Sequence, residues 1–206
     1  MRKILCTVLT TLLILQCLLL CSCRNNQSDL YAREIIKYIE EQMENTVECK
    51  YSEYTENRNT VNMKFVDVDS IAKIDAIIFH YNKYLKENSS YFMNKNKSVI
   101  IEFYFGEGST GTNRAATCSN TDDQYIDYLD LYCSSKAYSY RLSELDHRFS
   151  SIKYVCLGNK YYADKYDIFK TWPKIETVVI DSGRDIDALD LRDEIKEVCP
   201  DLQLYC

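Results

Sequence analysis

The sequence contains little proline, glycine and histidine, and each scarcity excludes a class of protein. Of its 206 residues, 2 are proline and 5 are glycine, which is too few for a collagen-like chain or for Pro-rich or Gly/Ser-rich linkers. His80 and His147 are its only histidines and no Cys-x-x-Cys pair occurs, so a zinc site or a haem attachment site has no support. Hydrophobic residues make up 46% and charged residues 27%, and this balance predicts a folded chain.

The first 23 residues follow the order of an export signal. Arg2 and Lys3 form a basic start, an apolar run covers residues 4–20, and polar residues begin at Arg24. The tetrapeptide Leu20-Cys21-Ser22-Cys23 resembles the lipobox of bacterial lipoproteins. This resemblance implies that Cys23 receives a lipid and that a peptidase cuts after Ser22. An uncleaved signal anchor is the alternative, because about 17–19 apolar residues just reach the length that spans a bilayer; plain secretion is another.

The export signal divides the chain. We expect residues 1–22 to be a signal peptide, residues 23–29 a lipidated tether, and residues 30–206 a globular domain held on the extracytoplasmic face of the cell membrane. Without Arg2 and Lys3, 23 basic residues stand against 31 acidic ones, a net charge of about −8. Such a balance disfavours nucleic acid as a partner.

Export also changes how the cysteines are interpreted. Four of the 10 cysteines belong to the export segment. Disulfides are permitted outside the cytoplasm, and six cysteines allow 15 full pairings. The sequence does not choose among them for the remaining six, which are Cys49, Cys118, Cys133, Cys156, Cys199 and Cys206.

Hydrophobic periodicity predicts an α-β-β-α-β order for residues 30–124. A first helix starts at Ser28 or Asp29, and alternation over Glu48–Tyr54 and Thr60–Val66 predicts a hairpin. Val99–Phe105 is almost continuously apolar, which predicts a strand buried on both faces, and residues 106–124 form a polar loop. A second helix follows Asp69 and Ser70, with a core-facing stripe of Ile71, Ile74, Ile78, Tyr81 and Leu85.

Residues 125–206 contain an internal β-α repeat. The segments that start at Leu129, Ile152, Ile175 and Leu202 match one another at offsets of 23, 23 and 27 residues. Helix-like stretches precede the later copies at Ser143–Phe149, Ala163–Trp172 and Asp185–Cys199. In this alignment Cys133 and Cys156 are equivalent, so we expect them to lie side by side on neighbouring parallel strands. Proximity alone does not make a disulfide.

Two of the copies extend to Leu-x-x-Leu-x-Leu, at Ile152…Val155…Leu157 and Ile175…Val178…Ile180. This pattern resembles leucine-rich repeats, in which each unit supplies a strand and a helix. In that family the third and fifth positions line a solvated face, whereas here they are mostly apolar. They are Leu131, Cys133, Tyr154, Cys156, Thr177, Val179, Leu204 and Cys206. We therefore expect a mixed α/β (α+β) domain in which the N-terminal helix–hairpin–helix–strand part covers that face of a parallel β-α-β run.

Four patterns suggest sites, and each has a simpler structural interpretation. Gly106-Glu107-Gly108-Ser109-Thr110-Gly111 spells G-x-G-x-x-G but no helix follows it. Glu102 and Glu107 resemble a glycosidase pair only if they lie close in space. His80 and His147 lack a recognisable nucleophile partner. The aspartates lack the calcium-loop pattern, and helix-start acids explain two of them; they are Asp181, Asp185, Asp187 and Asp190.

Tyrosine is the strongest compositional bias. Of 18 tyrosines, nine fall between Tyr125 and Tyr166. Tyrosine is favoured at recognition surfaces, although a general compositional bias is an alternative explanation. The candidate binding patch consists of Tyr138, Tyr140, Tyr161, Tyr162 and Tyr166.

We therefore predict a non-enzymatic, membrane-anchored binding or scaffolding lipoprotein without a cofactor, whose partner is a protein or peptide. An anchored immunity-type or inhibitor protein is the first alternative, since the negative charge would steer a basic toxin or hydrolase towards it. An extracytoplasmic hydrolase that uses carboxylates is the second.

Overall fold

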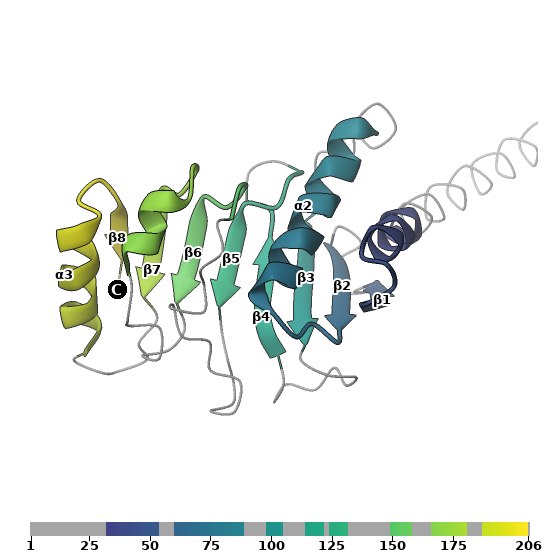
Figure 1. The fold of residues 1–206 in the computed structure, drawn as a ribbon, viewed down its shortest axis with the longest axis horizontal. Coiled ribbons are helices and arrows are strands. Elements are labelled where there is room, and N and C mark those ends of the chain that lie inside the picture. The colour runs from purple at the N-terminus through teal and green to yellow at the C-terminus, as the bar shows by residue number, and fades with distance from the viewer. Residues whose placement is uncertain are drawn as a thin grey trace, which may run out of the picture.

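The protein has a mixed α/β fold with one eight-stranded sheet (Figure 1). The computed structural model describes residues 32–53, 60–88, 98–104, 114–121, 124–131, 149–157, 166–180 and 187–205. The strands stand in the sheet in chain order. They are β1 Glu48–Glu53, β2 Thr60–Val66, β3 Ser98–Tyr104, β4 Arg114–Ser119, β5 Tyr128–Leu131, β6 Tyr154–Leu157, β7 Thr177–Ile180 and β8 Gln203–Tyr205. The helices are one at residues 32–42, α2 Ile71–Glu87, the 3-10 helix η3 Tyr166–Thr171 and α3 Asp187–Val198.

Strand direction divides the sheet into two parts. β1 and β2 form the predicted antiparallel hairpin, β2 and β3 are parallel, and β4 is antiparallel to both of its neighbours. From β5 to β8 every pairing is parallel. The predicted parallel arrangement of neighbouring strands β5 and β6 is therefore confirmed.

The core lies on one face of the sheet, which we call the core face. Alternate residues of the strands, such as Met63, Ile101 and Leu129, join one buried cluster with α2, η3, α3 and the helix at residues 32–42. In Figure 1, α2 crosses in front of β3 and β4. The prediction that Val99–Phe105 is buried on both faces is wrong, because Ile100 and Glu102 are only half-buried on the other face. We also expected the N-terminal helices to cover the second face of the repeat. This prediction is wrong, because these helices pack on the core face.

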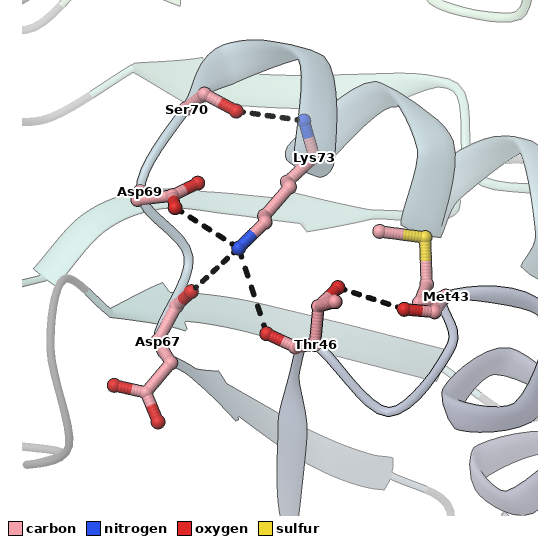
Figure 2. Close-up of polar contacts among 6 residues, drawn as sticks. All are labelled: Met43, Thr46, Asp67, Asp69, Ser70 and Lys73. Atoms are coloured by element: carbon pink, nitrogen blue, oxygen red, sulfur yellow. Dashed lines mark hydrogen bonds and ion pairs between the residues drawn. The ribbon is translucent and has the colours of Figure 1, made fainter.

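The second helix forms as its sequence predicts. The Ser70 hydroxyl caps it by accepting a hydrogen bond from the Lys73 backbone N–H at 3.3 Å. The predicted stripe is buried together with Ile77. Lys73 also holds the entry to α2 (Figure 2): its Nζ pairs with the Asp69 carboxylate at 3.1 Å and donates to the carbonyls of Asp67 and Thr46. These contacts join the start of α2 to the turn that precedes β1.

Strand β4 contradicts the prediction of a polar loop over residues 106–124. Arg114–Ser119 pairs with β3 on one side and with β5 on the other. Its core-face residues are Ala115, Ala116 and Cys118, all fully buried. Because these side chains are small, the hydrophobic pattern is weak and does not predict a strand. It is stabilised by its neighbours rather than by its own propensity.

The register of the parallel strands corrects the sequence alignment. Leu129 pairs with Val155, not with Ile152, so the first copy is shifted by three residues, and Leu204 pairs with Val178, a shift of one in the last copy. The corrected first copy is Ile126…Leu129…Leu131, and all three of its residues are fully buried. The Cα partner of Cys156 is Asp130, so the predicted equivalence of Cys156 with Cys133 is wrong; residue 133 lies outside the described part of the chain.

Backbone hydrogen bonds repeat with the corrected register. The Asp127 carbonyl accepts from the N–H groups of Lys153 and Tyr154 at 2.8 and 3.1 Å. The Lys153 carbonyl accepts in the same way from Glu176 and Thr177, again at 2.8 and 3.1 Å. Three copies of the apolar pattern therefore stack in register, and they begin at Ile126, Ile152 and Ile175.

The connections in the repeat differ from the helices that we expected. The stretch Ala163–Trp172 contains the 3-10 helix η3 rather than an α-helix. The stretch Asp185–Cys199 contains α3, as predicted. Most of Ser143–Phe149 lies outside the described residues. A β-α-β unit is thus described only for β7, α3 and β8.

Candidate functional site

The sheet face opposite the core is the candidate functional surface, and we call it the polar face. Strand register aligns its side chains in two rows that run across the sheet. One row is Lys50, Lys64, Glu102, Thr117, Asp130, Cys156, Val179 and Tyr205; the other is Asn62, Ile100, Ser119, Tyr128, Tyr154, Thr177 and Gln203. Most of these residues are half-buried or exposed. No described helix contributes its buried residues to this face.

An ion cluster occupies the part of the polar face over β2, β3 and β4. Glu102 is central: its carboxylate lies 3.4 Å from Lys64 Nζ and 3.5 Å from Arg114 Nη1. The Tyr104 hydroxyl donates a hydrogen bond to Glu102 Oε2 at 2.7 Å. The Glu102 side chain is 14% exposed, whereas those of Lys64 and Arg114 are 31% and 37% exposed. The two cations therefore face solvent more than the carboxylate they hold.

A β-bulge brings Arg114 into this cluster. Phe103 pairs with Ala116, but the next residue of β3, Tyr104, pairs with Arg114, so Ala115 is an extra residue in β4. Ala115 turns into the core, where it is fully buried. With strict alternation, Arg114 would have pointed to the core face. The bulge therefore directs its guanidinium to the polar face and to Glu102.

The cluster also fixes the protonation of Tyr104. Burial, followed by the hydrogen bond and the negative charge of Glu102, raises the pKa of Tyr104 to about 12, against a smaller opposing effect of Arg114. The phenol thus remains protonated at neutral pH and acts as a hydrogen-bond donor. It is not suited to serve as a base.

Aromatic and acidic groups occupy the part of the polar face over β5–β8. Tyr128 pairs with Tyr154, and Asp130 pairs with Cys156, across the parallel strands. Tyr205 at the end of the first row is 57% exposed. The polar face thus carries cations over its N-terminal strands and tyrosine over its C-terminal strands, a combination found at protein recognition surfaces.

Asn62 places a buried polar atom under the polar face. The amide oxygen Oδ1 of Asn62 is buried and accepts no hydrogen bond from the described residues. Asn62 lies two residues from Lys64 on the same face of β2. A buried acceptor without a donor is costly.

Burial makes three of the described cysteines poorly suited to nucleophilic chemistry. Burial raises the pKa of Cys49 to about 12 and also raises the pKa of Cys118 and of Cys199. The thiolate is the reactive form, so these thiols are unreactive near neutral pH. Cys156 is buried on the polar face. Within the described ranges, no three His, Cys, Asp or Glu side chains are grouped so that they could hold a metal ion.

The residues of the candidate tyrosine patch and of the lipobox lie mostly outside the described part of the chain. This holds for Cys23, Tyr138, Tyr140, Tyr161 and Tyr162, while Tyr166 begins η3. None of the helices within the described residues is long and apolar enough to cross a membrane.

The structure describes only some of the other candidate site residues from the sequence. Glu102 lies at the centre of the ion cluster, and Glu107, like the G-x-G-x-x-G segment, lies outside the described residues. Asp187 and Asp190 belong to α3, whereas Asp181, Asp185 and His147 are not described. His80 lies on α2 between the rings of Tyr38 and Phe79.

Sequence reasoning missed Lys64, Tyr104 and Arg114. Lys64 and Glu102 occupy the polar positions of alternating strands, and that alternation is visible in the sequence for β2. The bulge that directs Arg114 has no clear sequence signal, because Ala115 and Ala116 are both small. Comparison with known proteins found no matching family model, no matching curated protein and no matching solved structure.

Proposed function

We propose that the chain is a lipid-anchored, extracytoplasmic binding module that holds a protein or peptide partner on its polar face. The anchor is Cys23, as the resemblance to a lipobox implies. The binding role is non-enzymatic and needs no cofactor. Its strongest support is the polar face itself, where side chains from all eight strands, several of them charged or aromatic, stand in aligned rows.

The chemistry of the polar face supports a polypeptide partner. The ion cluster offers two partly exposed cations, Lys64 and Arg114, around one carboxylate. Such a cluster suits a carboxylate of a partner, with which arginine forms directional hydrogen bonds. The tyrosines over β5–β8 offer rigid contact area with a polar end. Together these groups match the mixed chemistry of a protein surface.

We further propose that residues 126–205 follow a leucine-rich-repeat-like plan. Three stacked copies of the apolar pattern, the parallel strands and the repeated backbone hydrogen bonds support this. In such repeats the strand face opposite the helices is the binding surface, and here that face is the polar face. The shortness of β8 and the 3-10 helix η3 distinguish this chain from regular copies.

The two alternatives have less support from the described residues. An immunity-type protein against a basic toxin needs an acidic surface, whereas the ion cluster holds two cations for one carboxylate. A carboxylate hydrolase needs two carboxyl groups that flank the substrate. Glu102 is instead held by Lys64, Arg114 and Tyr104.

Site-specific photo-crosslinking in the native host tests the binding role. A photoreactive amino acid is placed on the polar face, at Thr117 or Tyr154, and as a control on exposed helix positions, at Lys86 or Glu194. We expect one polypeptide to be captured from both polar-face positions and not from the controls. Capture from the helix positions alone, or no capture from the polar face, would contradict the proposal.

A charge variant makes the same test specific for the ion cluster. Lys64→Gln combined with Arg114→Gln should weaken capture at Thr117, because both cations are removed from the polar face. The control is Lys86→Gln, which removes a cation from α2. Equal capture in the two variants would show that the ion cluster does not take part in binding.

A further inference from the structure

An aromatic patch lies on the helical side of the domain, away from the polar face. It consists of Tyr38 in the helix at residues 32–42 and of Phe79, His80 and Tyr84 in α2. His80 lies between two rings, with centroid distances of 5.3 Å to Phe79 and 6.2 Å to Tyr38. The rings of Tyr38 and Tyr84 are 5.1 Å apart. The patch therefore spans the contact between the two helices.

Phe79 takes no part in the core packing of α2, although it is a large aromatic residue. The core-facing residues of α2 are Ile71, Ile74, Ile77, Ile78, Tyr81 and Leu85, and Phe79 is not among them. Phe79 is 49% exposed, and within the described residues only Tyr205 is a comparably exposed large hydrophobic residue. An exposed aromatic ring with aromatic neighbours indicates a contact surface.

The chain path places this patch near the anchor point. Nine peptide steps separate Cys23 from Ala32, where the described part of the first helix begins. Fully extended, these steps span about 30 Å, and Tyr38 lies about 9 Å further along the helix. Tyr205 stands at the opposite end of the sheet, seven strand spacings from β1, which is about 34 Å. Phe79, and not Tyr205, is therefore the exposed aromatic residue next to the tethered helix.

The composition of the patch suits a lipid surface. Aromatic rings with polar ends concentrate at the boundary between hydrocarbon and water. Lysine stems can extend along such a boundary while the ammonium stays in water. Lys37 adjoins Tyr38, and Lys83 lies close enough to His80 to act on its charge. Both lysines are ion-paired within their own helices, with Glu41 and Glu87.

We propose that the aromatic patch of Tyr38, Phe79, His80 and Tyr84 rests on the bilayer to which Cys23 is anchored. This inference depends on the proposed anchoring of the chain. Contact through the patch turns the helical side of the domain towards the lipid. The polar face, on the opposite side of the sheet, then points away from the membrane and stays open to a partner.

Tryptophan quenching by brominated lipid tests the contact. The lipid-modified protein is reconstituted into vesicles of phosphatidylcholine and phosphatidylglycerol, with and without brominated phosphatidylcholine. The only natural tryptophan, Trp172, is 3% exposed and gives a constant background. The two variants are Phe79→Trp and, as the matched exposed aromatic control, Tyr205→Trp. Circular dichroism checks that both variants are folded.

We expect the Phe79→Trp variant to lose emission and shift to the blue on brominated vesicles, while the Tyr205→Trp variant does neither. Equal quenching in both variants, or no quenching in Phe79→Trp, would overturn the proposal. A second preparation replaces the lipid at residue 23 with a histidine tag on nickel-chelating lipid. Stronger quenching of Phe79→Trp than of Tyr205→Trp in this preparation, together with release of the native chain from vesicles, would contradict the lipid anchor and support the contact of the patch with the membrane. If the native chain stays bound to the vesicles but the two variants are quenched equally, the contact of the patch with the membrane is contradicted and the lipid anchor is supported.

Discussion

The side chain of Asn82 in α2 forms hydrogen bonds with both backbone polar groups of Ile126. Its Oδ1 accepts from the Ile126 N–H at 2.8 Å, and its Nδ2 donates to the Ile126 carbonyl at 3.1 Å. Ile126 is fully buried and begins the first copy of the parallel repeat. One amide thus takes the place of a neighbouring strand and fixes the start of β5 against α2. The next residue, Asp127, is fixed as well, since its carboxylate accepts from both the N–H and the hydroxyl of Thr121.

The first prediction concerns this link. Asn82→Ala leaves the N–H and carbonyl of Ile126 buried without these partners, at a cost of about 1–3 kcal/mol for each group. Urea unfolding should show the loss as a lower midpoint. The control is Lys86→Ala on the exposed side of α2, with an expected change within about 0.5 kcal/mol. A similar midpoint for the two variants would show that water replaces the amide.

The second prediction concerns the core stripe of α2. Ile74 and Ile78 are both fully buried. Truncating either of them to alanine should lower the free energy of unfolding by about 2–5 kcal/mol, because the substitution leaves a cavity as well as losing apolar burial. Denaturant unfolding measures the change. A loss below about 1 kcal/mol in either variant would contradict the burial of the helix.

The third prediction concerns the proton of Tyr104. Spectrophotometric titration of the wild type minus that of Tyr104→Phe should reveal a phenol with a pKa of about 12. Glu102→Gln should lower this pKa, because the negative charge is lost, although burial remains the largest cause of the shift. A pKa that stays near 10 in the wild type would show that Tyr104 is neither buried nor bound to Glu102.

The raised pKa of Tyr104 also makes the free energy of unfolding depend on pH. The folded state holds the proton more tightly than the unfolded state, so the contribution of Tyr104 is complete below pH 10 and is lost as the pH rises towards 12. Tyr104→Phe should therefore lose less stability over this interval than the wild type does.

The fourth prediction concerns His80. Burial, and then the charge of Lys83, lowers the pKa of His80 below 6.5. The neutral ring is favoured in the folded state, so its contribution to stability is present above pH 6.5 and is lost as the pH falls through the folded pKa. NMR titration should find this pKa below 6.5, and Lys83→Gln should raise it in part. A pKa above 6.5 would contradict the burial of the ring.

Strong periodicity allowed the N-terminal elements to be predicted from the sequence. The apolar positions of α2 and of the β1–β2 hairpin recur at helical or strand spacing, and Ser70 marks the start of α2. These elements bury their own hydrophobic stripes, so local pattern and tertiary structure agree.

The remaining elements depend on neighbours that the sequence does not display. β4 is formed from small residues between two stronger strands, and its bulge at Ala115 is needed before Arg114 can meet Glu102. The register of β5 depends on Asn82, which is 44 residues away from Ile126 in the chain. The sequence alignment placed the first copy at Leu129, 23 residues before Ile152, whereas the register places it at Ile126, 26 residues before Ile152. Long-range contacts of this kind cannot be inferred from local spacing.

The anchoring of the chain is the claim on which both the binding role and the membrane contact depend, and mass spectrometry of the mature N-terminal peptide tests it most directly. We predict a mature chain that begins at Cys23 and carries a diacylglycerol on the thiol, together with an unprocessed, unlipidated precursor in Cys23→Ser. A mature chain that begins at Arg24 or another unmodified residue, or an intact chain that still begins at Met1, would contradict it.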